Sequence, residues 1–342
     1  MNMPKTELSI IIVSMNTADL LKQCLNSIFP LLHEVSSEVL VVDNNSSDGS
    51  VEMCEKSFPY VKLIKNSKNY GYGHANNQGI SASTGDLILL LNSDSIVTPG
   101  NIEKLINVIN KDSSIGVVGC RLISPDGRYQ SCCANFSNLN SVIVERLLLY
   151  KISKKLPTMS LEPPFLIHQK ECDWVLGACM LVRRKTLEEA GLFDPNIFMY
   201  VEEMELCYRI KAHGWKVVFE PDAKIIHVGG ASWNKKNYSK TFLIMVGLLF
   251  FYRKHFSLSS FLIVVIFYAI GSLLRLGIWS FLYTQKNKRE NILLEIKSNL
   301  KILRYLANKN LLFGNQNSQM FGKRLKNPSG ILCSPESNPN IS

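Results

Sequence analysis

The sequence has 342 residues, which is enough for one large domain with an appendage or for two domains. Hydrophobic residues make up 46% of it and charged residues 19%, values that describe a globular protein. Much of the net charge of +10 comes from lysines and arginines after residue 230, beside apolar runs. This placement suits an anionic membrane surface, and it argues against a nucleic-acid partner because no basic stripe with interleaved aromatic residues precedes it.

Strands and helices alternate along the first 120 residues. Short apolar runs predict buried strands, and apolar residues at helical spacing predict the helices between them. The predicted strands cover 8–13, 38–42, 61–65, 87–91 and 116–120, and the predicted helices cover 19–29, a short segment after Gly49, a segment ending near Gly85, and 101–110. Strands that alternate with helices predict an α/β fold with a mostly parallel central sheet flanked by helices.

The segment from Leu87 to Ser95, LILLLNSDS, is the centre of this pattern. Its five apolar residues predict a strand buried on both faces, and the polar residues Asn92, Ser93 and Asp94 follow where the strand ends. Ligands bind at the carboxyl ends of strands in open α/β sheets, and an aspartate there suits a divalent cation with its phosphates. A strand-end turn capped by a polar side chain is the structural alternative.

The pattern is weaker in the middle of the chain. Between 129 and 169 the sequence predicts a variable excursion with one helix over 141–150. Regular structure returns afterwards, with an ordered segment over 172–183, a helix over 185–190, a helix starting near Glu202, and a strand over 216–220 that Pro221 ends. The segment 225–230, IIHVGG, closes the folded part.

The last third of the chain is apolar and basic. The run over 241–252 is short for a membrane span, whereas 256–274 is uncharged for about the required length and 276–285 continues it after Arg275. Basic residues lie on both sides, so the segment 256–285 can span the membrane, re-enter it or lie on it, and a core helix of a soluble domain is the further alternative. The tail from Asn315 is rich in Asn, Ser and Pro, a composition that predicts disorder.

The nine cysteines indicate a reducing compartment. They form no CxxC pair and no zinc-type spacing with histidine, and most have apolar neighbours, which predicts buried free thiols; they are residues 24, 54, 120, 132, 133, 172, 179, 207 and 333. The N-terminus has no basic region followed by an apolar core and a cleavage site, so we expect the catalytic part to lie in the cytoplasm.

Three polar clusters follow the first strands and converge if the sheet forms. Ser14 and Asn16 follow the first strand, and Asp43 follows the second, where a carboxylate commonly accepts hydrogen bonds from a base or ribose. The third cluster is the loop over 69–73 with the amides after it, whose glycines let the backbone approach a ligand. The spacing GxGxxG after a strand is absent, which disfavours a dinucleotide fold.

Two further groups carry reactive side chains. His227 lies between an apolar pair and two glycines, a strand-end position where it can join Asp94 as a metal ligand or remain structural. The acidic run Glu202, Glu203 and Glu205 begins a helix, where the macrodipole alone favours carboxylates. One of these carboxylates could also act as a general base toward an incoming hydroxyl, and burial beside other carboxylates would raise its pKa toward working pH.

Taken together, these segments resemble the family-2 glycosyltransferases, most closely the rhamnosyltransferase-like branch that builds bacterial surface polysaccharides. The resemblance covers about residues 7–233, and its motifs follow the family order. They are SIIIVSMN, VVDNNSSDGS, NYGYGHANNQGI, LILLLNSDS, DWVLGACMLVRR, GLFDPNIFMYVEEMELCYRI and HGWKVVFEPDAKIIHVGGAS.

The resemblance implies a GT-A fold and binding of a nucleoside-diphosphate sugar. It assigns the base and ribose to Ser14, Asn16 and Asp43, and the remaining nucleotide-sugar contacts to Asn69, Gly71, Asn77, Asn92 and Ser93. Asn92-Ser93-Asp94 takes the place of the family's Asp-x-Asp, so the resemblance implies Mg²⁺ or Mn²⁺ held by Asp94 and His227. Because Asn92 replaces the first acid, we expect looser metal binding than an Asp-x-Asp site gives.

The resemblance also implies an inverting transfer of one sugar. The family base is the aspartate of a Glu-Asp pair, and this sequence has Glu202-Glu203, so Glu203 is the expected base with Glu202 and Glu205 as alternatives. The processive signature Gln-x-x-Arg-Trp is absent. The expected donor is dTDP-L-rhamnose, with galactose, glucose or N-acetylglucosamine as other sugars, and the expected acceptor is a polyprenyl-diphosphate-linked saccharide of O-antigen or polysaccharide synthesis.

These expectations predict a catalytic domain over 1–235, a membrane-associated helical region over 236–314 and a disordered tail over 315–342. The expected location is the cytoplasmic face of the plasma (inner) membrane, and a homodimer is left open. A homologue that binds nucleotide sugar without catalysis is one alternative, which the Glu-Glu pair supports. A membrane-anchored structural protein is the other, and it leaves the clustered polar strand ends unexplained.

Overall fold

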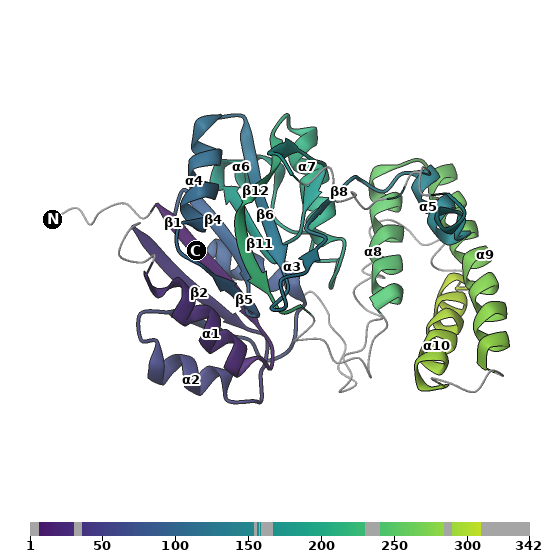
Figure 1. Ribbon diagram of the computed structural model, residues 1–342, viewed down its shortest axis with the longest axis horizontal. Coiled ribbons are helices and arrows are strands. Elements are labelled where there is room, and N and C mark those ends of the chain that lie inside the picture. Colours follow the sequence, from purple (N-terminus) through teal and green to yellow (C-terminus); the bar gives the residue numbers. More distant parts are fainter. Residues whose placement is uncertain are drawn as a thin grey trace, which may run out of the picture. The chain divides into compact units, whose positions relative to one another are not determined.

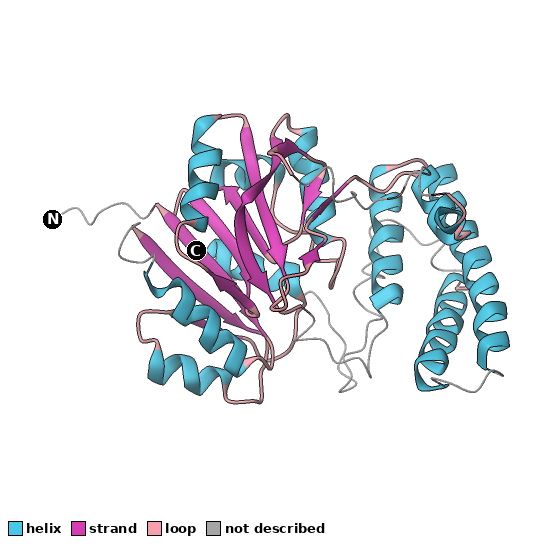
Figure 2. Ribbon diagram, in the orientation of Figure 1, coloured by secondary structure: helices cyan, strands magenta, loops and turns pink. Residues whose placement is uncertain are grey.

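The computed structural model describes residues 7–30, 36–153, 156, 158, 167–229, 240–283 and 289–308. The described residues form two compact units. The first lies within 1–136, 160–194 and 202–233, and the second lies within 137–159, 195–201 and 234–342. A sheet with helices packed on it makes up the first unit, and helices make up most of the second (Figure 1, Figure 2).

The first unit is built on one mixed sheet with the strand order β3-β2-β1-β4-β11-β6-β12-β5. Its strands are β1 (Leu8–Ser14), β2 (Ser37–Asp43), β3 (Lys62–Lys65), β4 (Leu87–Asn92), β5 (Ser95–Val97), β6 (Ile115–Ile123), β11 (Cys179–Arg183) and β12 (Lys216–His227). Strands β3, β2, β1 and β4 are parallel, and β11 runs antiparallel to both β4 and β6. The ends of β1, β2 and β4 are level, because Ser14 pairs with Asp43 and Val13 with Asn92.

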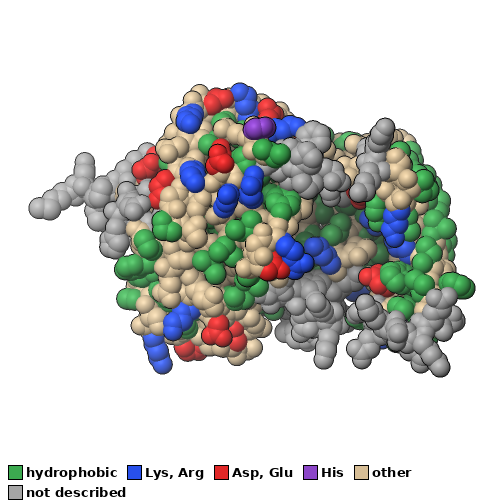
Figure 3. Space-filling model, viewed as in Figure 1, with side chains coloured by type: hydrophobic (Ala, Val, Ile, Leu, Met, Phe, Trp, Pro, Cys, Tyr) green, Lys and Arg blue, Asp and Glu red, His purple; other side chains and the backbone are tan. Residues whose placement is uncertain are grey.

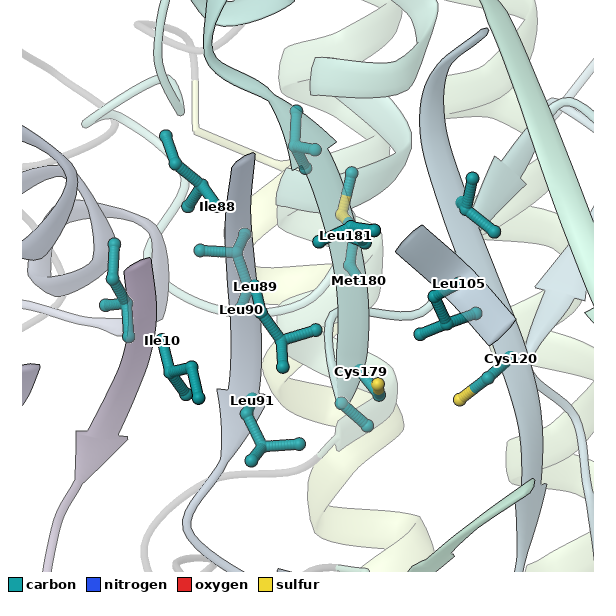
Figure 4. Packing of buried hydrophobic residues seen from close by; sticks show 14 of the residues in the cluster. Ile10, Ile88, Leu89, Leu90, Leu91, Leu105, Cys120, Cys179, Met180 and Leu181 are labelled. Carbon is teal, nitrogen blue, oxygen red and sulfur yellow. The ribbon is translucent and has the colours of Figure 1, made fainter. Parts of the chain in front are cut away.

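Helices cover this sheet and complete its core. They are α1 (Ala18–Ile28), α2 (Ser50–Ser57), α3 (Tyr72–Ser81), α4 (Asn101–Lys111), α6 (Arg184–Ala190) and α7 (Glu202–Ala212). Helix α3 packs on β1 and β2, α4 on β6 and β12, and α6 on β11. The central strands are apolar along their length because both faces are buried, and Figure 4 shows Ile10, Leu89 and Leu181 from three of them in one core.

The predicted α/β pattern is confirmed, with three differences in detail. The loop predicted over 69–73 is shorter than expected, since α3 begins at Tyr72, and α3 ends at Ser81, before the predicted end near Gly85. Ser95 was expected where the chain leaves the sheet after the fourth strand, but it begins a further strand, β5, which pairs with β12. Pro221 was expected to end a strand, but β12 continues to His227 through an irregularity between Glu220 and Lys224, and Pro221 has no paired residue in β6 there.

The weakly patterned middle of the chain holds short elements of both units. The first unit gains β7 (Tyr129–Gln130), β8 (Cys133–Ala134), β9 (Lys170–Glu171) and β10 (Trp174–Val175), of which β7 pairs with β6. The second unit gains α5 (Leu139–Arg146), shorter than the predicted 141–150, and the 3₁₀ turn Leu149–Lys151. Part of the predicted variable excursion, including 159–166, lies outside the described residues, as does the tail from Asn315.

The described residues of the second unit also form the helices α8 (Lys240–His255), α9 (Leu258–Tyr283) and α10 (Arg289–Leu306). Helix α10 lies within the region 236–314 that was expected to be helical, although the sequence predicted no bounds for it. The apolar run was expected to continue after Arg275, and α9 runs through this residue without a break. The Arg275 guanidinium donates to the carbonyl oxygens of Arg146 (2.7 Å), Glu145 (2.9 Å) and Gly271 (3.0 Å), so its charge has partners inside the unit.

Helix α9 has one apolar side that the unit leaves uncovered. In Figure 3 hydrophobic side chains line the outer edge of the region that α9 occupies in Figure 1. The exposed residues are Leu258, Leu262, Ile266, Ile270, Leu273, Leu274, Ile278 and Phe281, whereas Phe261, Val264 and Tyr268 are buried. Among the described residues α9 is the one helix long and apolar enough to cross a membrane, judged by length and composition alone.

Candidate active site

The ends of β1 and β2 form the first part of the candidate site. Asp43 ends β2 and is 3% exposed. Its Oδ2 accepts a hydrogen bond from the Ser46 backbone N–H at 2.9 Å, and its Oδ1 has no hydrogen-bond partner among the described residues. A buried carboxylate oxygen without a partner is costly unless a ligand completes it, so Asp43 is equipped to accept a hydrogen bond from a base or ribose.

Asn16 connects the loops after these two strands. Its backbone adopts the left-handed region, with φ of 52°, which asparagine tolerates better than most residues. The Asn16 N–H donates to Ser46 Oγ at 2.9 Å, and Asn16 Oδ1 accepts from the Ser47 N–H at 2.8 Å. These bonds hold the loop after β1 against the loop after β2, next to Asp43.

The loop over 69–73, which was predicted to contact the nucleotide sugar, lies beside the ends of β1 and β2. Asn44 Nδ2 donates to the carbonyl of Gly71 at 3.2 Å, and the Gly71 N–H donates to Asn69 Oδ1 at 2.8 Å. Gly71 has φ of 89° just before α3, a conformation that favours glycine. Asn77 lies further along α3. Its Nδ2 donates to the Phe193 carbonyl at 2.8 Å, and its Oδ1 accepts from the Phe193 N–H at 3.0 Å.

A chain of buried hydroxyls joins β1 to the turn after β4. Ser14 Oγ lies 3.0 Å from Thr17 Oγ1, and Thr17 Oγ1 donates to Ser93 Oγ at 2.9 Å. All three residues are buried. The hydroxyl chain therefore fixes the Asn92-Ser93-Asp94 segment relative to the end of β1, and the structure brings Ser14 and Ser93 together as the level strand ends require.

Asp94 and His227 face one another at the end of β12. Asp94 Oδ1 lies 3.3 Å from His227 Nε2, and both side chains are largely buried. The Gly229 N–H donates to Asp94 Oδ2 at 3.0 Å, and Asn92 Nδ2 lies 3.2 Å from His227 Nε2. On its other side, His227 Nδ1 lies 2.7 Å from Gln130 Oε1. Asp94 and His227 thus come together from distant positions in the sequence.

The donor atoms of this pair fit a hard divalent cation. Carboxylate oxygen is a ligand of both Mg²⁺ and Mn²⁺, whereas imidazole nitrogen suits the transition ion Mn²⁺ better than Mg²⁺, and both ions commonly take further ligands from phosphates and water. Within the described residues, no group of three or more His, Cys, Asp or Glu side chains could hold a metal by itself. An ion at Asp94 and His227 would therefore depend on a phosphate-bearing ligand for most of its coordination.

The acidic residues at the start of α7 have three different environments. Glu203 Oε1 accepts a hydrogen bond from the Gly177 backbone N–H at 3.2 Å. Glu202 is 2% exposed, and its Oε2 has no hydrogen-bond partner in the described part of the chain. Glu205 is fully buried and pairs with Arg209, whose Nη2 lies 2.8 Å from Glu205 Oε2. This ion pair makes Glu205 the least available of the three to take a proton.

Burial changes the proton affinity of the other two glutamates. It raises the pKa of Glu202 well above the usual glutamate range, and the charge of Glu203 raises it further. Burial also raises the pKa of Glu203, although the N–H groups of Glu203 and Gly177 oppose the shift. A carboxylate with a raised pKa and a fixed orientation has the properties of a general base near neutral pH.

One peptide segment, Gly177-Ala178, connects the acidic pair to the end of β4. Gly177 contacts Glu203 through its N–H, and its carbonyl accepts from Tyr72 Oη at 2.7 Å. The next carbonyl, that of Ala178, accepts from the Asn92 N–H at 3.0 Å and from Ser95 Oγ at 3.2 Å. Adjacent residues of one extended segment therefore contact the candidate base Glu203 and the two residues, Asn92 and Ser95, that flank Ser93-Asp94.

Two family models match overlapping parts of the chain. The model described as "Glycosyl transferase family 2" matches residues 9–158, and "Glycosyl transferase family group 2" matches residues 87–284, which is more than half of the chain. The chain belongs to glycosyltransferase family 2. The family predicted from the sequence motifs is thereby confirmed.

Relatives of this family-2 chain include proteins named as rhamnosyltransferases. One is N-acetylglucosaminyl-diphospho-decaprenol L-rhamnosyltransferase from Mycobacterium tuberculosis (strain CDC 1551 / Oshkosh), 28% identical over 205 residues. That match covers 55% of this chain and 66% of the relative, slightly less than two thirds of its length. Rhamnosyltransferase WbbL from Escherichia coli (strain K12) is 27% identical over 244 residues, covering 68% of this chain and 87% of WbbL.

The solved structures show the fold of this family-2 chain. A crystal structure of GalNAc-T7 with UDP, GalNAc and Mn²⁺ matches with a TM-score of 0.53 and 16% sequence identity, covering 89% of this chain and 56% of that one. At this identity the likeness concerns the fold alone. Together with the mixed sheet and its flanking helices, it confirms the predicted GT-A fold.

Several residues of the site were not predicted from the sequence. Thr17, Gln130 and Gly177 each contact a predicted residue, and Tyr72 in turn donates a hydrogen bond to the carbonyl of Gly177. Gly177 lies in the motif DWVLGACMLVRR, which carried the family resemblance, but the motif did not indicate the contact of Gly177 with Glu203. Gln130 lies in the weakly patterned middle of the chain, where no sequence signal pointed to it.

Proposed function

We propose that this protein is an inverting, metal-dependent, non-processive glycosyltransferase. The best candidate for its donor is dTDP-L-rhamnose, and the best candidate for its acceptor is a hydroxyl of a polyprenyl-diphosphate-linked saccharide in O-antigen or polysaccharide synthesis. Family membership supports the reaction class, and the names of two relatives favour rhamnose. The name of the mycobacterial relative also favours a lipid-linked acceptor.

We assign the nucleoside of the donor to the ends of β1 and β2. The buried Asp43 Oδ1, which lacks a hydrogen-bond partner among the described residues, would accept from the base or ribose. Ser14 and Asn16 would contact the nucleoside beside Asp43, and Asn69 and Gly71 would contact it from the loop before α3. Asn77 would support this loop through its bonds to Phe193.

We assign the diphosphate to the segment Asn92-Ser93-Asp94. Asp94 and His227, 3.3 Å apart, would hold the divalent ion, and Asn92 and Ser93 would lie beside the phosphates. Mg²⁺ or Mn²⁺ bound there would act as a Lewis acid and neutralise charge on the leaving diphosphate. The Gly229 N–H keeps the Asp94 carboxylate turned toward His227.

The transfer itself requires a base, and we assign this role to Glu203. Glu203 would take the proton of the acceptor hydroxyl while the hydroxyl oxygen bonds to the anomeric carbon. The bond from that carbon to the diphosphate oxygen breaks at the same time, the diphosphate leaves with the electron pair, and the configuration inverts. Glu202, whose pKa is raised by burial and by the charge of Glu203, is the second candidate for the base.

The observation that carries this proposal is the Gly177-Ala178 segment. It binds the Glu203 carboxylate through one residue and the Asn92 backbone through the next. A base and a diphosphate site held by adjacent residues suit a reaction in which deprotonation and departure of the leaving group occur together.

A donor screen tests the proposal. Full-length protein would be incubated with Mn²⁺ and a panel of nucleotide sugars including dTDP-rhamnose, UDP-galactose, UDP-glucose and UDP-N-acetylglucosamine, and donor hydrolysis and thermal stabilisation would be measured. We expect both signals with dTDP-rhamnose, and loss of hydrolysis with retained stabilisation in Glu203→Gln. Absence of both signals with every donor would contradict the proposal.

One observation favours a second candidate function, that of a binding protein without catalysis. Glu203 occupies the position of the family's aspartate, and its longer side chain is buried against Gly177. The screen separates the two functions. A non-catalytic homologue would be stabilised by a donor and would show equal, background hydrolysis in the wild type and in Glu203→Gln.

We further propose that the chain acts at the cytoplasmic face of the plasma membrane. The uncovered apolar side of α9 would contact lipid, and Arg253 and Lys254 in the last turn of α8 would contact anionic headgroups. Such a location would bring the catalytic unit to an acceptor with a polyprenyl anchor. The domain boundary at residue 235 and the homodimer remain predictions.

A further inference from the structure

Gln130, at the end of β7, contacts His227 twice. Its Nε2 donates to the backbone carbonyl of His227 at 2.7 Å, and its Oε1 lies 2.7 Å from His227 Nδ1. The carbonyl oxygen can only accept a hydrogen bond, which fixes which end of the Gln130 amide is the nitrogen. The amide oxygen therefore faces Nδ1, and Nδ1 must carry the hydrogen of that contact.

If the ring is neutral, a hydrogen on Nδ1 leaves the opposite nitrogen, Nε2, without one. A neutral ring with its proton on Nδ1 has a lone pair on Nε2. The Asn92 amide nitrogen, 3.2 Å from Nε2, is a donor and suits that lone pair. Asp94 Oδ1, 3.3 Å away, is an acceptor and does not. Two acceptor atoms facing each other repel unless a cation joins them.

Gln130 itself is held by the sheet. Gln130 pairs with Leu122 of β6, and β6 also pairs with β12, the strand that ends at His227. The side chain therefore reaches His227 from a neighbouring position on the same sheet, and its two bonds to one residue prevent rotation of the amide. Such an arrangement fixes an imidazole in both orientation and tautomer.

We propose that Gln130 is a positioning residue that holds His227 in the tautomer with a free Nε2 lone pair directed at Asp94. This inference rests on the metal-dependent function proposed above. Without Gln130, the proton can move to Nε2 and be donated to Asp94 Oδ1. That bond would occupy both ligand atoms, and a divalent ion would have to break it before binding.

The tautomer is measurable in the full-length protein before any metal is added. In protein labelled with ¹⁵N-histidine, the protonated and unprotonated ring nitrogens have separate ¹⁵N shifts, and the His227→Asn variant identifies the signals of His227. We expect the Nδ1–H form in the wild type and in Gln23→Met, a matched change at an exposed glutamine of α1. We expect the Nε2–H form to gain population in Gln130→Met. A wild type with the Nε2–H form, or a Gln130→Met variant with an unchanged spectrum, would overturn the proposal.

Metal affinity provides the second readout. The protein would be titrated with Mn²⁺ alone, and binding would be monitored by the loss of the electron paramagnetic resonance signal of free Mn²⁺. The affinity should be about 10- to 100-fold weaker in Gln130→Met than in the wild type. Binding of dTDP in the presence of a chelator should not change. Equal Mn²⁺ affinities in the two proteins, within about twofold, would contradict the assignment of Gln130 while leaving the proposed transfer intact. A failed donor screen with the expected tautomer would instead contradict the transfer alone.

Discussion

The Glu203 carboxylate and the Gly177 backbone N–H form a hydrogen bond of 3.2 Å in a space that has no room for a side chain. A Cβ added to Gly177 would lie 2.8 Å from Tyr72 Oη and 3.0 Å from Glu203 Oε1. The backbone of residue 177 thus serves as a fixed surface against which the proposed base is oriented. Glycine is required here by close approach and not by its backbone angles.

Gly177→Ala should therefore lower kcat while leaving the donor KM nearly unchanged. The added methyl group displaces Glu203 and Tyr72, and a displacement of about 1 Å at a reacting group can cost on the order of 100-fold in rate. Steady-state kinetics on the full-length protein measure both constants. Gly277→Ala is the matched control, because a Cβ at that exposed position of α9 meets no atom within 4 Å. An equal loss in both variants would show that the effect is not local.

The transfer rate should fall at acid pH with an inflection above the ordinary range of glutamate. The base must be deprotonated, and burial raises the pKa of Glu203, so activity is present above that pKa and is lost as pH falls through it. A pH profile of kcat/KM reports this value for the free enzyme. A profile whose acid limb lies at the ordinary glutamate pKa of about 4.3 would argue against a buried base.

Glu202→Gln should stabilise the protein at neutral and alkaline pH. The folded state raises the pKa of Glu202, so the stability that the wild type has below the unfolded-state pKa is lost as pH rises toward the folded-state pKa. The glutamine side chain does not ionise, so we expect the variant to have a higher free energy of unfolding than the wild type at pH 8 and a nearly unchanged one at pH 4.5. Urea unfolding at pH 4.5 and pH 8 measures it. An equal gain at both pH values would mean that titration is not the cause.

Substitutions at the two ends of Asn92-Ser93-Asp94 should change metal dependence in opposite directions. Asp94→Ala removes the only carboxylate of the segment and should lower the transfer rate by roughly 100-fold or more. Asn92→Asp restores a second acid and should tighten Mn²⁺ binding by about tenfold, the size of one charged contact of about 1.4 kcal/mol. Mn²⁺ titrations and rates at several Mn²⁺ concentrations measure both. Unchanged activity in Asp94→Ala would remove the metal site from the mechanism.

The triple variant Ile266→Ser, Ile270→Ser and Leu273→Ser should weaken membrane binding. All three side chains are on the uncovered side of α9, and each buried aliphatic side chain contributes about 1.5–3 kcal/mol, so binding should fall by at least about tenfold. Flotation with anionic vesicles measures it, with circular dichroism to check the fold. The pair Phe29→Ser and Tyr60→Ser changes exposed aromatic residues of the first unit and should leave flotation unchanged. Full flotation of the triple variant would contradict contact between α9 and lipid.

The sheet and most of its helices could be predicted from the sequence because its strands are apolar without interruption. Residues 8–13 and 87–91 allow few alternatives to buried parallel strands, and the polar residues after them then converge by geometry. Pro221 misled the prediction because a proline usually ends a strand, whereas a local irregularity of β12 accommodates it. The start of α3 was missed since a segment rich in asparagine and glycine has low helix propensity.

The supporting contacts of the site could not be predicted in the same way. Asp94 and His227 carry side chains that suit a metal, so their chemistry marked them in the sequence. Gln130 and Gly177 have no such mark, and their roles depend on distances set by pairing across the sheet. Glu205 could not be separated from Glu202 and Glu203 until its pairing with Arg209 was visible, because all three occupy the first turn of one helix.

Arg275 changes what kind of anchor α9 can be. Its guanidinium donates to two carbonyls at the end of α5, and a guanidinium that lost them in hydrocarbon would be costly to bury. Any bilayer that takes up the middle of α9 must therefore also accommodate the last turn of α5. Among the described residues, hydropathy identifies α9 alone as a candidate membrane helix. Because of this contact, α9 would enter lipid together with α5, and the shorter α5 would limit how deeply the pair enters.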